Sequence, residues 1–94
     1  MPSEFVPARE MLAQMLAINQ EPKEALAEYE AVLKVAPNRF NALYGAAVAA
    51  EASGQPEIAK NYYQKVKDIA PGSQRAEQKT AAEKLSSLSA RSTP

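Results

Sequence analysis

Carboxylates at helical spacing are the side chains in this sequence that come closest to a catalytic arrangement. Glu24 and Glu28 are four residues apart and Glu30 follows two later, so general acid–base catalysis is one interpretation. A water-facing helix surface explains the same spacing, and we prefer that interpretation. Serines are concentrated near the C-terminus, but the chain has no histidine to activate them and no cysteine. The residue types therefore predict no catalytic residues.

The composition also predicts no cofactor and no metal. Histidine and cysteine, the usual zinc ligands, are absent, and the three glycines are isolated rather than grouped in a phosphate-binding loop. Lys+Arg and Asp+Glu both number 11, so the net charge of zero argues against binding nucleic acid. The longest uncharged run covers residues 40–50, too short to insert into a membrane. With no signal peptide visible, a cytoplasmic location is the default expectation, and the location is unknown if the chain is a fragment.

A chain of 94 residues forms one small domain with a modest core. Hydrophobic residues make up 46% of the sequence, but 19 residues are alanine. Because alanine favours helices and buries little surface, we expect closely packed helices around a thin core.

An internal repeat organises the sequence. Shifting the chain by 34 residues aligns Pro22 with Pro56 and Pro37 with Pro71. Six further identities fall at the same offset: Ala8/Ala42, Ala13/Ala47, Ala25/Ala59, Tyr29/Tyr63, Val32/Val66 and Ala36/Ala70. Two proline coincidences at one offset are hard to obtain by chance, so the chain contains two copies of one unit.

Each unit reads as two helices. Pro22 and Pro56 suit a first helical turn, and Pro37 and Pro71 stop the second helix of each unit. Asn38 is a plausible N-cap. Helices are predicted at about residues 7–18, 22–35, 39–52, 56–69 and 74–88.

The predicted helices differ in their apolar faces. Met11, Leu12, Met15, Leu16 and Ile18 recur at helical spacing in the first helix. The third, over residues 44–50, is apolar on nearly all sides, which predicts neighbours all around it. The last has a weak apolar face and is expected to cap the others.

This pattern resembles the tetratricopeptide repeat, a paired-helix unit of 34 residues with small residues at fixed offsets and a closing proline. Arg9 and Leu43 stand where the family often has an aromatic residue, and Gln20 replaces the turn glycine in the first unit. The matching structural positions are Ala13, Ala25, Tyr29, Pro37, Ala47, Gly54, Ala59, Tyr63 and Pro71.

The resemblance implies an all-α fold: a right-handed superhelix of two antiparallel helix-turn-helix repeats with a C-terminal capping helix. The corresponding segments are an N-terminal extension (residues 1–5), repeat 1 (6–39), repeat 2 (40–73), the capping helix (74–88) and a disordered tail (89–94). It also implies a non-enzymatic function, because members of this family bind other proteins in a concave groove lined by the first helix of each repeat.

Carrying over the groove positions gives the expected partner-binding residues Gln14, Asn41, Tyr44, Val48, Arg75 and Lys79. Glu10, Ala17 and Glu51 occupy further groove positions. Only Arg75 and Lys79 match the basic residues with which some members clamp a peptide carboxylate, so that ligand is not expected. Tyr44 has two interpretations, a contact for the partner or a packing residue against the capping helix.

Two functions remain open at this point. The first is a protein-interaction scaffold that binds a partner peptide or segment in the groove. The second is a structural or oligomerising segment of a larger repeat protein, with no ligand of its own. Residues 1–36 carry a net charge of −3 and residues 60–94 a net charge of +4, so self-association is also open.

Overall fold

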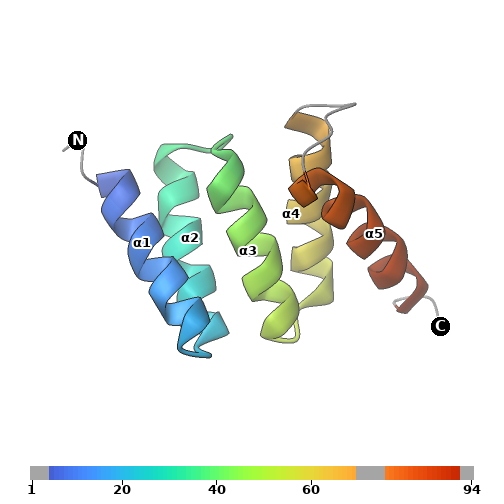
Figure 1. The fold of residues 1–94 in the computed structure, drawn as a ribbon, viewed down its shortest axis with the longest axis horizontal. Helices are drawn as coiled ribbons and strands as arrows, with labels where there is room; N and C mark the ends of the chain where they lie inside the picture. The colour runs from blue at the N-terminus through green and yellow to red at the C-terminus, as the bar shows by residue number, and fades with distance from the viewer. Residues whose placement is uncertain (1–4, 70–75, 92–94) are drawn as a thin grey trace.

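The computed structural model describes residues 5–69 and 76–91, and this part of the chain consists of helices with no strand. The helices are α1 (Phe5–Ile18), α2 (Pro22–Val35), α3 (Phe40–Ala52), α4 (Pro56–Ile69) and α5 (Ala76–Arg91). They lie side by side in chain order, with α1 and α5 at opposite ends of the row (Figure 1). The all-α fold of paired helices is therefore confirmed. None of the helices described is both long and apolar enough to cross a bilayer.

The helix boundaries follow the prolines closely. α2 and α4 have the predicted limits, and each begins at its proline. α1 begins at Phe5, earlier than predicted, because Pro7 lies in the first turn, where a missing N–H breaks no helical hydrogen bond. α1 therefore includes Phe5, the last residue of the predicted N-terminal extension.

The expected tail was wrong over residues 89–91, because α5 continues to Arg91. No proline or glycine interrupts the sequence between Ser73 and Pro94, so nothing in the chain stops the helix at Leu88. The rest of that tail, residues 92–94, and the predicted positions Pro71 and Arg75 lie outside the described residues.

The start of α3 differs from the prediction of an Asn38 cap. Arg39 is the N-cap residue, with an extended backbone and no side-chain capping bond. Its carbonyl accepts a hydrogen bond from the amide of Leu43. Its side chain has no acceptor atom with which to cap the helix, and it donates instead to Glu10 on α1.

Small residues set the distances between the helices. Ala13, Ala25, Ala47 and Ala59 are completely buried in the core, as are most alanines of α3. Each helix packs against the next one in the chain, and α1 also contacts α3. Larger side chains at these positions would push the helices apart.

The two units meet where Tyr29 of α2 packs on Gly45 of α3. Tyr29 is buried, and a Cβ atom at Gly45 would lie 2.3 Å from the Cζ atom of the tyrosine ring. Gly45 is therefore required by the ring rather than by its own backbone, which is helical. Tyr29 therefore fills the space between the two units.

The turns inside the two units share one backbone conformation. Gly54 has φ +79°, and Gln20, its equivalent in the first unit, has φ +62°. In both turns the next amide donates a hydrogen bond back to the helix, from Glu21 to Leu16 and from Gln55 to Ala50. Gln20 thus adopts a left-handed conformation that glycine would adopt without a steric cost.

Replacing Gln20 by glycine is expected to stabilise the protein by about 0.5–1 kcal/mol, because it removes this backbone strain. Urea unfolding followed by circular dichroism measures the change. Gln20→Ala is the control, since alanine keeps the Cβ atom and should bring no gain. A similar gain in both variants would contradict the explanation.

Gly45→Ala is expected to destabilise the protein by about 1–2 kcal/mol, although alanine is the better helix former, because its methyl group overlaps the Tyr29 ring. In a Tyr29→Leu background the ring is absent, and Gly45→Ala should become neutral or stabilising. A double-mutant cycle of unfolding free energies tests this coupling. An equal loss in both backgrounds would show that the ring is not the cause.

Candidate functional site

A shallow apolar hollow joins the C-terminal halves of α1 and α3, the first helices of the two units. Its volume is about 330 Å³, and it is lined by Ala17, Gln20, Pro22, Val48, Ala49 and Ala52. Ala17 and Val48 are both positions that the resemblance places in a groove, and the fold brings them to one surface. Because α1 and α3 are the first helices, or A helices, of the two units, we call the surface around Ala17 and Val48 the A-helix face.

The expected partner-binding residues are distributed unevenly over the structure. Val48 lines the hollow and leaves 42% of its surface exposed. Gln14 of α1, Asn41 of α3 and Lys79 of α5 are exposed but do not line it. Their participation in binding therefore stays a prediction.

Tyr44 has a packing role that bears on its two interpretations. It is half-buried, and its ring meets the ring of Tyr63 edge-on, with centroids 6.2 Å apart and planes at 72°. Edge-to-face pairs of this kind stabilise a core beyond the area they bury. Tyr44 thus packs within its own helical pair, and part of its surface stays accessible.

Glu51 links α3 to the two helices that follow. Its carboxylate accepts hydrogen bonds from the Tyr63 hydroxyl at 3.0 Å and the Lys84 ammonium at 3.1 Å. Burial raises the pKa of Tyr63, and the hydrogen bond to Glu51 and the neighbouring Tyr44 act in the same direction. The sequence placed Glu51 in the groove, but nothing in its spacing indicated Lys84 as a partner.

Glu10 is not available to a ligand, although the resemblance placed it in the groove. It is buried and accepts two hydrogen bonds from Arg39, at 2.7 Å from Nε and 3.0 Å from Nη2. Burial raises the pKa of Tyr29, and the nearby charge of Glu10 adds to that effect. The Glu10–Arg39 pair therefore ties α1 to the start of α3.

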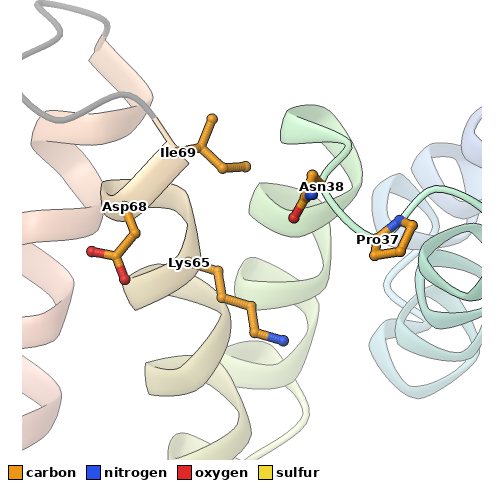
Figure 2. A pocket seen from close by; sticks show the side chains of 5 residues that line it. All are labelled: Pro37, Asn38, Lys65, Asp68 and Ile69. Atoms are coloured by element: carbon orange, nitrogen blue, oxygen red, sulfur yellow. The ribbon is translucent and has the colours of Figure 1, made fainter.

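A second hollow lies between the loop that joins α2 to α3 and the C-terminal end of α4. Its volume is about 510 Å³, and Pro37, Asn38, Lys65, Asp68 and Ile69 line it. Figure 2 shows the Lys65 side chain extending across the hollow toward the loop, while the Asp68 carboxylate points away. The sequence did not predict this hollow, because it forms between segments far apart in the chain.

Tyr62 joins the second helices of the two units. Its hydroxyl donates a hydrogen bond of 2.8 Å to Glu30, so α2 and α4 are bridged next to a hollow of about 530 Å³. The Lys65 ammonium lies over its ring. Burial, together with the hydrogen bond and charge of Glu30, raises the pKa of Tyr62 to about 12.

Two of the α2 carboxylates that the sequence grouped together contact neighbouring helices. In the described ranges the acidic side chains form no group of three that could bind a metal ion. Glu28, which the sequence grouped with Glu24 and Glu30, forms an ion pair with Arg9 at 2.7 Å. The carboxylates of Glu28 and Glu30 are therefore structural partners of neighbouring helices.

Comparison with known proteins identifies the second unit. Residues 40–73 match the family model of the tetratricopeptide repeat, and α3 and α4 lie within this range. The match confirms the resemblance identified from the sequence. Among curated proteins no similar sequence is found. Repeats of this family typically form non-enzymatic scaffolds for protein interaction.

The raised pKa of Tyr62 predicts lower stability in alkali. An unfolded tyrosine ionises near pH 10, whereas Tyr62 in the fold ionises near pH 12, so the unfolded state loses its proton first. This contribution is complete below pH 10 and is lost as the pH rises to 12. The measurement is the free energy of unfolding in urea at several pH values between 8 and 12.

Tyr62→Phe removes this titration, so the stability of the variant should fall less steeply between pH 10 and 12 than that of the wild type. All other ionisable side chains are the same in both proteins, so the difference between the two curves reports on Tyr62. Parallel curves for the two proteins would contradict the assignment.

Proposed function

We propose that this chain, whose residues 40–73 form a tetratricopeptide repeat, is a non-enzymatic scaffold that binds a segment of a partner protein along the A-helix face. The observation that carries the proposal is the apolar hollow between α1 and α3, which exposes Val48 beside alanines. Small residues around one larger aliphatic side chain leave room for an apolar side chain of the partner.

The polar residues around the hollow would orient the partner segment. Gln14 and Asn41 are exposed amides that can donate and accept hydrogen bonds with a peptide backbone. Tyr44 contributes its accessible edge. Arg75 and Lys79 would favour acidic residues at the end of the segment nearest α5.

A structural role is the second candidate, and one observation favours it. The exposed side of α1 carries large apolar residues that no helix of this chain covers in the described structure. Such a surface suits an element that packs against other helices rather than a peptide ligand.

Selection from a random peptide library displayed on phage tests binding at the A-helix face. Peptides selected on the wild type should bind Val48→Arg about tenfold more weakly by calorimetry, because arginine fills the hollow. Val35→Arg is the matched control, since Val35 on α2 is similarly exposed, at 41%, and lies outside the hollow. Failure to select any peptide, or equal weakening by both variants, would reject the proposal.

A further inference from the structure

The outer side of α1 is the most apolar exposed surface in the described part of the chain. Met11, Met15 and Ile18 leave 62%, 60% and 83% of their surfaces exposed, and Leu12 is also exposed. The other large apolar residues exposed in the described ranges, Val35, Val48 and Ile69, lie on three different helices. We call the four α1 residues the outer α1 face. A cluster of this kind indicates a contact surface.

The internal repeat shows what normally covers this side of the helix. At the offset of 34, Met11, Leu12 and Met15 correspond to Gly45, Ala46 and Ala49 of α3. In α3 that side packs under α2, and the two alanines are buried. In the second unit, the α3 positions equivalent to the outer α1 face are therefore covered by a helix, α2.

A second copy stacking end to end does not fit this face. Gly45 is small because the Tyr29 ring lies against it, but Met11 stands at the same register in α1. A helix bearing an equivalent tyrosine would collide with the Met11 side chain. At the other end of the row α5 covers α4, and the exposed side of α5 presents Lys79, Ala82, Glu83 and Ser86, which offer no apolar partner surface.

We infer that the outer α1 face binds the same face of a second copy, as an antiparallel helix pair related by a two-fold axis. In this arrangement Met11 of one copy lies opposite Ile18 of the other, and Met15 lies near the axis. In most homodimers the two copies are related by a two-fold axis, and the same surface of each copy forms the contact. The two methionines adapt their flexible side chains to fill the space between the helices.

The charges of α1 permit this pairing. Arg9 and Glu10 are the charged residues of α1, and they form ion pairs inside the same molecule with Glu28 and Arg39. Pairing the α1 helices of two copies therefore brings no unpaired like charges together.

The size of the surface sets the strength of the pairing. One helix contributes the contact, so it buries less than the roughly 800 Å² per partner of a typical stable complex. We therefore expect a reversible dimer with a dissociation constant on the order of 100 µM.

Sedimentation velocity across roughly 10 µM to 2 mM tests the dimer. The wild type should shift from monomer to dimer, whereas Met15→Glu should stay monomeric, since it places two like charges near the axis. Val48→Glu is the control and should dimerise like the wild type. Circular dichroism should show both variants folded, because both positions are exposed.

The same two variants separate this inference from the proposed function. Met15→Glu should still bind the selected peptides, and Val48→Glu should lose them while keeping the dimer. A wild type that stays monomeric up to 2 mM, or a dimer that Met15→Glu leaves intact, overturns the inference, including the case in which the face serves a different protein.

Disulfide cross-linking tests the orientation, because the chain has no cysteine of its own. Met11→Cys mixed with Ile18→Cys should form a cross-linked dimer under mild oxidation. Either variant alone should cross-link poorly, since two copies of the same residue lie about 10 Å apart along an antiparallel pair, beyond the reach of a disulfide. Met11→Cys alone cross-linking as well as the mixture would overturn the antiparallel arrangement.

Discussion

The close approach of α2 and α3 is the constraint on which the row of helices depends. It brings the Tyr29 ring against the backbone of Gly45, at a distance that no side chain on Gly45 could share. Completely buried alanines hold the helices at similarly short distances within each unit. Because few large side chains are available, the core gains its density from small residues that let the backbones approach each other. Each unit adds one buried tyrosine ring, Tyr29 or Tyr63, to this core.

The two units share a sequence pattern but use it differently. Tyr29 and Tyr63 are equivalent by position and both are buried, yet Tyr29 lies on a glycine of the next unit while Tyr63 meets Tyr44 and Glu51 of its own. Glu10 and Tyr44 also occupy equivalent positions, but Glu10 is buried in an ion pair and Tyr44 meets the Tyr63 ring edge-on. The two helical pairs therefore carry different polar networks, and residues 40–73, which contain the second pair, match the family model.

The sequence predicted the helices because their limits are local properties. Pro22 and Pro56 begin helices whatever surrounds them, and the offset of 34 marks the positions of the buried alanines. The ion pairs could not be predicted, since Glu10 and Arg39 are 29 residues apart and no periodic signal connects them. The apolar spacing of Met11 and Met15 suggested a packed face, whereas burial depends on a neighbour that residues 5–69 and 76–91 do not provide. Of the expected binding residues, Val48 lies at a hollow because small neighbours surround it, a property of tertiary packing.

The sequential packing of the helices shapes how the molecule opens. Each helix contacts mainly its neighbours in the chain, so structural fluctuations need not involve the whole protein. α5 packs mainly against α4, with Lys84 also bonded to Glu51 of α3, and few of its described residues are buried. We therefore expect its backbone amides to exchange with deuterated solvent before those of α2 and α3, so that fraying spreads inward from that end of the row.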